Sequence, residues 1–439
     1  MIAIDTLIHA RWIIPVEPDN TVLDYHSIAI HEGRIIALLP TTQATATYHA
    51  DTTFSLNEHA LIPGLVNAHT HAAMSLFRGL ADDLPLMEWL NNHIWPAEGA
   101  WVNAEFAHHG TQLAIAEMLR GGTTCFNDMY FFPDETARTA EECQMRATVG
   151  LIVIDFPTVW AASADEYINK GLALHDRYRS HPLIHTAFAP HAPYTVSNAP
   201  LDKIRTYADE MDIPIHMHIH ETVDEINQGL THYKTRPLQR LGQLGLLSPH
   251  LIGVHMTQLA DDEINRYAAT GAHVVHCPES NLKLASGFCP VQKLVNAGVN
   301  VAIGTDGAAS NNDLDMFSEM RTAALLGKAV ANDASAVSAA TVLRMATLNG
   351  ARALGWDEDI GSLLPGKAAD ITAVHLGGIE TQPIYHPVSQ LAYATGRDKV
   401  TDVWVAGKHL LKNRVLTTLD ERAILTNAQT WREKIKKYD

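Results

Sequence analysis

Cysteine, positive charge and long hydrophobic runs are all scarce in this chain. Its 439 residues include four cysteines, with no CxxC pair among them, which is typical of reduced core thiols in a cytosolic protein. The formal net charge is −17, and this charge argues against a phosphate-backbone partner. No apolar run is long enough to cross a bilayer. We therefore expect a cytoplasmic protein whose partner is neither a membrane nor a nucleic acid.

Both ends of the chain contain short runs that are typical of β-strands. They are TLIHARWII, HSIAIHEGRIIALL and TTFSLN near the N-terminus, and AADITAVHL, VTDVWVAGKHLL and VLTT near the C-terminus. HEGRI and VAGKHLL each place a glycine where a hairpin turns. The runs predict one small β-sandwich domain built from residues 1–60 and 361–439. A charged helical pattern over residues 419–437 is expected to lie outside it.

The middle of the chain alternates strand-like and helix-like patterns. Helical patterns such as EFAHHGTQLAIAEMLRGG and PLDKIRTYADEM separate apolar strand-like runs. The eight runs are LIPGLVNAH, TTCFNDMY, ATVGLIVIDF, LIHTAFAPH, IPIHMHIHE, LIGVHMT, HVVHCPES and VNVAIGTDG. Eight consecutive βα units predict a fold of the α/β class, a (β/α)₈ TIM barrel over residues 61–360.

Histidine is abundant, with 25 residues, and several histidines and carboxylates stand at the ends of the predicted barrel strands. Catalytic side chains of such barrels lie at these C-terminal strand ends. A hydrogen bond to a backbone carbonyl readily explains one buried histidine, but not a set that converges from six strand ends. A bound cation accounts for the set, because neutral imidazole is the commonest metal ligand. The residues are His69, His71, His191, His218, His220, Glu221, His255, His276 and Asp306.

The first and last barrel strands point most directly to a metal site. His69 and His71, in HTH, are two residues apart, so their side chains share a face and can bind one ion. Asp306, in GTDG, adds an anionic oxygen from the last strand. With one imidazole from the fifth strand and a water molecule, these ligands suit one Zn²⁺ per chain, with Fe²⁺ as the alternative. Such an ion lowers the pKa of its bound water to about 7.

The fifth strand, HMHIHE, leaves the identity of its ligand open. His216, His218 and His220 all lie on one face, so side-chain alternation does not choose among them. Glu221 follows His218 by three residues, and a carboxylate beside the ion can carry a proton from the water to a leaving group. The alternative interpretation of Glu221 is a helix-start residue, because HETVDEI is also typical of a helix N-terminus.

Longer motifs along the whole chain resemble those of the amidohydrolase superfamily. PGLVNAHTH, HIHET, GVHMT, HCPESNLKLASG and IGTDGAASNN are similar to motifs of its mononuclear metal deaminases, and SLFRGLADDLPLMEWLNNHIWPAE and HAPYT also fit that group. The resemblance implies hydrolytic deamination of an adenosine-type nucleoside, 5′-methylthioadenosine and/or S-adenosylhomocysteine, to the inosine derivative and ammonia. It also implies a homodimer or homotetramer.

The resemblance further implies roles for individual residues. The family's metal histidine on strand five precedes its catalytic glutamate by three residues, which implies that His218 is the ligand and Glu221 the proton shuttle. His255 is implied to orient the metal-bound water, and Asp306 to hold it together with His255. Glu98 is implied at the ribose hydroxyls. The residues implied to bind the substrate are Trp89, Glu98, His191, His218 and Ser310.

Two polar residues receive no secure role from these motifs. His276 belongs to a typical motif without an assigned function. Arg146 is a candidate partner for a homocysteine carboxylate only because it lies near the third strand.

Other activities fit the same fold or the same ligands. A binuclear hydrolase usually carries a carboxylated lysine at the end of strand four, and LIHTAFAPH has no lysine. A triazine hydrolase often lacks the shuttle glutamate, so Glu221 favours deamination, while an aminotriazine or an oxidised guanine stays open as the substrate. The alternative from another class is a metal-binding protein without catalysis, which an incomplete ligand set would favour.

Overall fold

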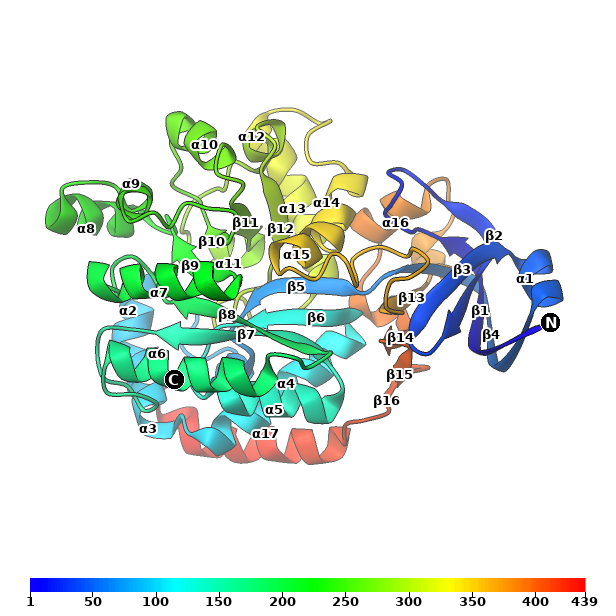
Figure 1. The fold of residues 1–439 in the computed structure, drawn as a ribbon, viewed down its shortest axis with the longest axis horizontal. Coiled ribbons are helices and arrows are strands. Elements are labelled where there is room, and N and C mark those ends of the chain that lie inside the picture. The colour runs from blue at the N-terminus through cyan, green and yellow to red at the C-terminus, as the bar shows by residue number, and fades with distance from the viewer. Residues whose placement is uncertain (439) are drawn as a thin grey trace.

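The central part of the chain forms a nearly closed barrel of eight parallel strands, which confirms the predicted fold (Figure 1). The computed structural model describes residues 1–438. Each strand pairs with the next one along the chain. The first and last strands meet through a hydrogen bond from Asp306 N to His69 O (3.0 Å). The barrel strands are β5 (Leu65–Thr70), β6 (Thr123–Asp128), β7 (Arg146–Val153), β8 (Ile184–Pro190), β9 (Ile215–Ile219), β10 (Leu251–His255), β11 (His273–His276) and β12 (Asn300–Ile303).

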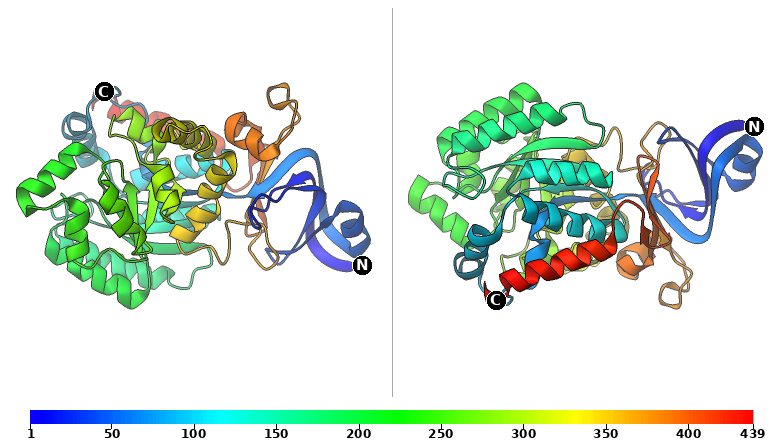
Figure 2. Two further views of the ribbon diagram at one scale, coloured as in Figure 1. Left: turned by 90° about the horizontal axis from the view of Figure 1, so that it is seen from above. Right: turned by 90° about the horizontal axis from the view of Figure 1, so that it is seen from below.

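The two ends of the chain together form one mixed sheet of eight strands. Its strands are β1 (Ile2–Ile13), β2 (Leu23–His31), β3 (Arg34–Pro40), β4 (Tyr48–Pro63), β13 (Ile371–His375), β14 (Val400–Val405), β15 (Lys408–Lys412) and β16 (Val415–Leu416). They are ordered β16-β15-β14-β13-β4-β1-β2-β3, and β4 pairs with β1 in parallel and with β13 in antiparallel register. The predicted pairing of the two chain ends is therefore confirmed. Figure 2 shows this sheet standing beside the barrel.

One glycine links the sheet to the barrel. Gly64 lies between β4 and β5, and a Cβ atom at this position would lie 2.0 Å from Thr124 Oγ1. Because any side chain would collide with β6, glycine is required where the chain passes into the first barrel strand.

Helices surround the barrel and its mouth. Those within and around the barrel are α2 (Leu86–Trp89), α3 (Trp95–Trp101), α4 (Ala104–Arg120), α5 (Pro133–Cys143), α6 (Ala164–Tyr178), α7 (Asn198–Met211), α8 (Val223–Tyr233), α9 (Pro237–Gln243), α10 (Asp261–Ala268), α11 (Pro278–Lys283), α12 (Val291–Asn296), α13 (Met316–Ala331), α14 (Ala339–Met345) and α15 (Leu348–Ala353). The others are α1 (Thr41–Thr47), α16 (Pro387–Tyr393) and α17 (Glu421–Ile435). Short 3₁₀ segments are η1 (Ala72–Phe77), η3 (Ile379–Thr381), η4 (Arg397–Lys399) and η5 (Lys436–Tyr438), and η2 (Leu90–Ile94) is a π-helical turn. Among the described residues, no helix is both long and apolar enough to cross a membrane.

The terminal helix α17 lies outside the sheet, as predicted, and packs along the barrel helix α4 (Figure 2). Trp431 of α17 is buried, its ring lies 5.2 Å from the ring of Phe106, and its Nε1 donates to His109 Nδ1 (3.1 Å). The far C-terminal segment therefore covers the helix that leads into β6.

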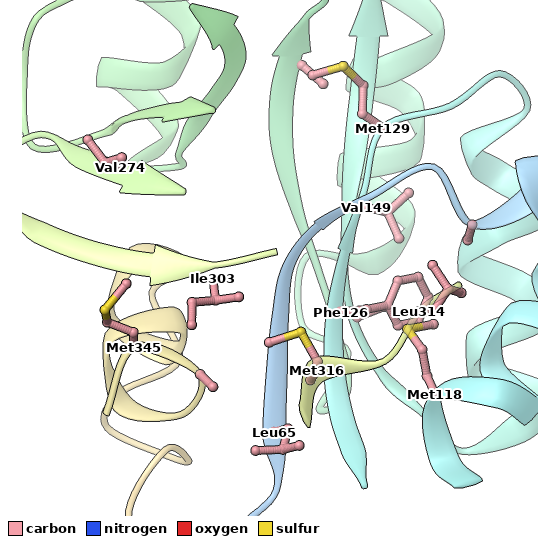
Figure 3. Packing of buried hydrophobic residues seen from close by; sticks show 14 of the residues in the cluster. Leu65, Met118, Phe126, Met129, Val149, Val274, Ile303, Leu314, Met316 and Met345 are labelled. Carbon is pink, nitrogen blue, oxygen red and sulfur yellow. The ribbon is translucent and has the colours of Figure 1, made fainter. Parts of the chain in front are cut away.

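The core fills the space between strands and helices with apolar side chains. In Figure 3, Leu65 of β5, Phe126 of β6 and Val149 of β7 lie among methionines from the surrounding helices, including Met118 of α4. All four side chains are fully buried. Such close packing holds the strand ends in fixed positions, and the polar residues of the site are attached to those ends.

Candidate metal centre and substrate cavity

Four of the predicted residues converge at the mouth of the barrel. The ligand atoms of His69, His71, His218 and Asp306 all lie within 4.8 Å of one another. His69 Nε2 lies 3.2 Å from His218 Nε2 and 3.3 Å from Asp306 Oδ1, and His71 Nε2 lies 3.3 Å from the same oxygen. They come from β5, from β9 and from the loop after β12. Parallel strands that end at one mouth bring together residues far apart in the sequence.

Backbone carbonyls fix which ring nitrogens carry hydrogen in two of these histidines. His71 Nδ1 donates to Met129 O, and His218 Nδ1 donates to His191 O at 2.8 Å. A carbonyl oxygen only accepts, so in the neutral rings Nε2 is a bare lone pair. Both Nε2 lone pairs point into the group of ligand atoms that includes the Asp306 carboxylate. Acceptors that face one another at this distance require a proton or a cation between them, so the donor set fits a bound metal ion.

The electrostatics of two of the four residues, His71 and Asp306, show the same requirement, whereas burial lowers the pKa of His69 to about 4. Burial lowers the pKa of His71, but hydrogen bonding to Asp306 and the charge of that carboxylate raise it to about 9. Burial raises the pKa of Asp306, whereas the hydrogen bonds from His69 and His71 bring it well below its usual value. A positive charge is thus stabilised at this position, and a divalent cation can replace the proton.

Asp306 is also held from behind. Ser280 Oγ donates to its Oδ2 at 2.6 Å, and Gly307 N donates to Oδ1 at 2.7 Å. The residue has a φ of 62°, in the left-handed region. Non-glycine residues in that region are uncommon and are often found at functional sites.

The structure separates the three histidines of strand five. His218 reaches the ligand group, whereas His216 Nε2 lies 3.0 Å from His69 Nδ1, on the side of His69 away from Asp306. His220 Nε2 accepts from Leu238 N (3.1 Å) and does not belong to the group. Histidine ligands commonly use their second nitrogen in this way, and the partner orients the ring.

Glu221 lies beside the ligand group and is held through its backbone. Its N–H donates to Glu225 Oε2 and the N–H of His220 donates to Glu225 Oε1, both at 2.8 Å. Thr257 Oγ1 donates to Glu221 O at 2.6 Å. Burial raises the pKa of Glu221, with smaller opposing effects of His255 and Ser286. A buried carboxyl group with a raised pKa is suited to giving and taking protons.

His255 lies next to Glu221, with its Nε2 4.0 Å from Glu221 Oε2. Its Nδ1 donates to Asn281 Oδ1 at 2.8 Å, which leaves Nε2 as the basic nitrogen. The ring is stacked on His218, with the ring centroids 5.4 Å apart. This arrangement directs Nε2 toward the ligand group.

The centre opens into a cavity of about 320 Å³. All the residues predicted to bind substrate or to act in catalysis line it; they are Trp89, Glu98, His191, His218, Glu221, His255, Asp306 and Ser310. The rest of the lining is largely apolar. A concave, mostly apolar cavity with a few convergent polar groups is typical of a small-molecule site.

Glu98 of α3 enters this cavity from the long segment after β5. Tyr130 OH donates to its Oε1 at 2.7 Å. Burial raises the pKa of Glu98 to about 7, and the Tyr130 hydroxyl opposes that rise. Trp89 of α2 is buried, with its Nε1 donating to Leu80 O (3.3 Å).

Two predicted residues lie elsewhere or stay without a role. Arg146 is the first residue of β7, at the end opposite the mouth, where it pairs with Asp370. It is therefore no partner for a ligand in this cavity. His276 is buried at the end of β11, and burial lowers its pKa to about 3, which keeps the ring neutral.

Several supporting residues were missed by the motifs. Tyr130, Glu225, Ser280 and Asn281 hold, respectively, Glu98, the backbone of Glu221, Asp306 and His255. Ser280 and Asn281 are adjacent in HCPESN, and that pair of polar residues after a predicted strand end was the available signal.

Known proteins match this chain over nearly its full length. A sequence profile described as Amidohydrolase family matches residues 60–410. A protein named 5-methylthioadenosine/S-adenosylhomocysteine deaminase from Teredinibacter turnerae is 51% identical over 432 residues, which cover 98% of both chains. A protein of the same name from Saccharophagus degradans is 50% identical, over 98% of this chain and 97% of its own.

Solved structures agree with the fold. A structure of an adenosine deaminase from Xanthomonas campestris with bound zinc is 56% identical, with a TM-score of 0.99 over 99% of both chains. A triazine hydrolase variant, 22% identical, has a TM-score of 0.91 over 97% of this chain and 99% of its own, and shares the fold.

Proposed function

The chain belongs to the amidohydrolase family, and we propose that it removes the amino group from the adenine ring of 5′-methylthioadenosine and/or S-adenosylhomocysteine by hydrolysis. The products are the corresponding inosine derivative and ammonia. One observation carries the proposal: a His₃Asp ligand group lies directly beside Glu221, a buried carboxyl group, at the end of a nucleoside-sized cavity. The names of the relatives with about half of their residues identical support the same reaction.

His69, His71, His218 and Asp306 are the residues that would hold the metal, which we propose to be one Zn²⁺ per chain. Three imidazoles and a carboxylate suit zinc, and the similar Xanthomonas campestris structure contains zinc. When bound, the cation supplies Lewis acidity that lowers the pKa of a water molecule toward ~7.

Glu221 moves the proton in this proposal. Its raised pKa and its place at the cavity wall allow it to take a proton from the attacking water and deliver it to N1 of the purine. Protonation of N1 removes negative charge from the ring while the new C6–O bond forms. Glu225 and Thr257 fix the backbone at Glu221, so the carboxyl group stays within reach of both positions.

His255 and Asp306 orient the water from the other side. His255 offers the basic Nε2 because Asn281 binds its Nδ1. Asp306 is held by Ser280 and offers its remaining acceptor capacity to the same water. Together these groups take the second proton and pass it to the C6 amino group, which leaves as ammonia when the C6–N bond breaks.

We assign the substrate-binding roles to Trp89, Glu98, His191 and Ser310. A carboxylate accepts hydrogen bonds from both ribose hydroxyls, which makes Glu98 the ribose-binding residue, and Tyr130 holds it in the cavity wall. Trp89 provides an apolar surface for the 5′-thioether. Ser310, after β12, and His191, after β8, lie nearer the metal ligands, where the purine binds.

An ammonia-release assay over a panel of substrates tests this proposal. We expect rapid release from 5′-methylthioadenosine, slow release from free adenine, and none from an oxidised guanine or an aminotriazine. Free adenine is poor because it brings no ribose hydroxyls to Glu98, whose carboxylate then keeps the Tyr130 hydroxyl as its donor. Faster release from a guanine or a triazine than from every adenosine derivative would contradict the proposal.

We also propose a cytoplasmic location and a homodimer or homotetramer. All four cysteines are buried and unpaired in the described part of the chain, which suits a reducing compartment. Light scattering of the purified protein measures the oligomeric state, and a monomer would contradict it.

A further inference from the structure

The position of Glu98 locates the 5′ end of a bound nucleoside, if the proposed function holds. With the purine at the metal ligands and the ribose at Glu98, a 5′ substituent lies beyond Glu98, toward the rim of the cavity. Trp95 lines the cavity one helical turn before Glu98 on α3. The loop after β7 also lines the cavity, with Phe156 and Val159.

This rim is apolar and partly uncovered. The exposed fractions of Trp95, Phe156 and Val159 are 37%, 44% and 41%. Large apolar side chains grouped at the mouth of a cavity mark a surface that a ligand covers. Leu86, Leu90 and Ile154 continue the same surface inward.

Apart from the histidines, all the ionisable side chains with a formal charge that line the cavity are acidic. Glu98, Glu221 and Asp306 line it, and none of the lining residues in the described chain is a lysine or an arginine. Arg146, the one arginine that the sequence offered for a carboxylate, is buried at the other end of the barrel.

Three cations that neighbour lining residues are already bound by groups of the protein. Lys283, next to the lining residue Leu284, donates to Asp82 at 2.7 Å and to Asn312. Arg240 lies behind Tyr194, where its guanidinium donates to Pro193 O, Val196 O and Asn198 Oδ1. Lys170, beside the loop after β7, donates to Trp160 O and pairs with Glu166 at 2.8 Å. All three cations therefore have partners within the chain.

We propose that this cavity selects adenosine derivatives with an uncharged, apolar 5′ substituent and discriminates against the zwitterionic homocysteine tail. An apolar group covers the rim formed by Trp95, Phe156 and Val159. A carboxylate at the same place finds no lysine or arginine to pair with among the described residues that line the cavity. The inference rests on the proposed deamination and narrows its substrate class to 5′-methylthioadenosine and similar thioethers.

Three substrates separate charge from size. They are 5′-methylthioadenosine, 5′-butylthioadenosine and S-adenosylhomocysteine, and the butyl compound has a tail about as long as homocysteine without its charges. We expect similar kcat/KM for the two uncharged thioethers and a value at least about tenfold lower for S-adenosylhomocysteine. Equal values for all three, or a butyl compound as poor as S-adenosylhomocysteine, would overturn the inference and leave deamination intact.

A variant at the rim tests the missing cation directly. Val159→Arg adds a guanidinium at an exposed position, with Val159→Gln as the matched uncharged control. We expect Val159→Arg to raise the ratio of kcat/KM for S-adenosylhomocysteine over 5′-methylthioadenosine by about tenfold relative to Val159→Gln. Equal ratios in the two variants would contradict the role of charge. If the wild-type protein released ammonia from none of the three nucleosides, the proposed function itself would fail, and the inference with it.

Discussion

The two ends of the barrel each bury a carboxylate, but they satisfy it differently. At the closed end, Arg146 and Asp370 have side chains 2% and 1% exposed. Arg146 binds both carboxylate oxygens, at 3.0 and 3.1 Å, and Ala406 N donates to the same carboxylate at 2.8 Å. The indole of Trp356 lies over the guanidinium, 4.6 Å from its centre. Both charges of this pair have their partners within the chain.

At the mouth, Asp306 faces imidazole nitrogens that carry lone pairs. Carbonyl acceptors take the Nδ1 hydrogens of His71 and His218, so the chain supplies no permanent donor between Nε2 and the carboxylate. The comparison shows how to distinguish buried charge that stabilises a fold from buried charge that binds a ligand. Buried charge that stabilises the fold has all its partners within the chain. Buried charge that binds a ligand has its full set of partners only when a cation is bound.

Removing one ligand is expected to have the largest effect. In His69→Ala the metal content per chain should fall to near zero and ammonia release to background, because the remaining ligands no longer enclose an ion. His216→Gln is the matched control, since His216 touches only the far nitrogen of His69. It should lose about 10–100-fold in metal affinity. Metal analysis and turnover measure both variants, and a fully metal-loaded His69→Ala would contradict the ligand assignment.

Glu221→Gln should separate metal binding from chemistry. We expect full metal content and turnover lower by about 10²–10⁴-fold, because the amide cannot shuttle a proton. Glu225→Gln tests the support of the same residue. The amide oxygen can accept one of the two N–H groups of Glu221 and His220, but the amide nitrogen cannot accept the other, so this variant should also lose turnover while retaining metal. Wild-type turnover in Glu221→Gln would exclude the shuttle.

The closed end of the barrel should affect stability and not chemistry. Asp370→Ala leaves Arg146 buried without its partner, and the free energy of unfolding should fall by about 3–5 kcal/mol. The double variant Arg146→Met with Asp370→Leu should recover part of that loss. Urea denaturation measures it, and kcat per folded molecule should stay at the wild-type value. A large loss of kcat in folded Asp370→Ala would show that the two ends are not independent.

The smallest effect is expected at Tyr130. In the proposed binding mode, ionised Glu98 accepts from the ribose hydroxyls. We therefore expect kcat/KM for 5′-methylthioadenosine to rise as pH increases through about 7, the value to which burial raises the pKa of Glu98. The Tyr130 hydroxyl stabilises the ionised form, and Tyr130→Phe should therefore raise that pKa and shift the rise to higher pH. The effect of Tyr130→Phe should be small, because losing one hydrogen bond typically costs about 0.5–1.5 kcal/mol of net free energy.

The control for this shift is Glu98→Gln, in which the rise assigned to Glu98 should be absent. A pH profile that is identical in wild type and Tyr130→Phe would show that Glu98 does not titrate in substrate binding.

The sequence was sufficient for the fold and the ligand group because both follow from strand order. Eight βα units imply a common mouth, and residues at strand ends must meet there, as His69 and Asp306 do. The choice of His218 over His216 is a matter of depth along the strand. Alternation gives the face but not the depth, so only the family resemblance or the structure decides it.

Contacts between loops could not be predicted in the same way. Tyr130 follows β6 and Glu98 lies in the long segment after β5, and nothing in their spacing shows that the two side chains meet. For Arg146, in contrast, the sequence suggested a ligand contact that the structure does not contain. It precedes the apolar run of its strand, so the direction of a parallel strand already places it at the closed end.

The backbone adds a further signal that sequence patterns do not contain. His220, His255 and Asp306 have φ values of 55°, 73° and 62°, a region that costs non-glycine residues of order 1–3 kcal/mol. All three lie at barrel strand ends beside the ligand group. The surrounding hydrogen bonds hold these conformations in place; for example, His220 N donates to Glu225 and Ser280 Oγ donates to Asp306.

The central claim is that one cation binds to the lone pairs of the histidine and aspartate ligands at the mouth of the barrel. The metal content per chain tests this claim most directly. Elemental analysis of the purified wild-type protein, with ammonia release from 5′-methylthioadenosine measured before and after chelation, provides the test. We predict one divalent metal per chain, zinc or iron, loss of turnover when it is removed, and recovery when it is restored. Full turnover by the metal-free protein, or two tightly bound ions per chain, would contradict the account.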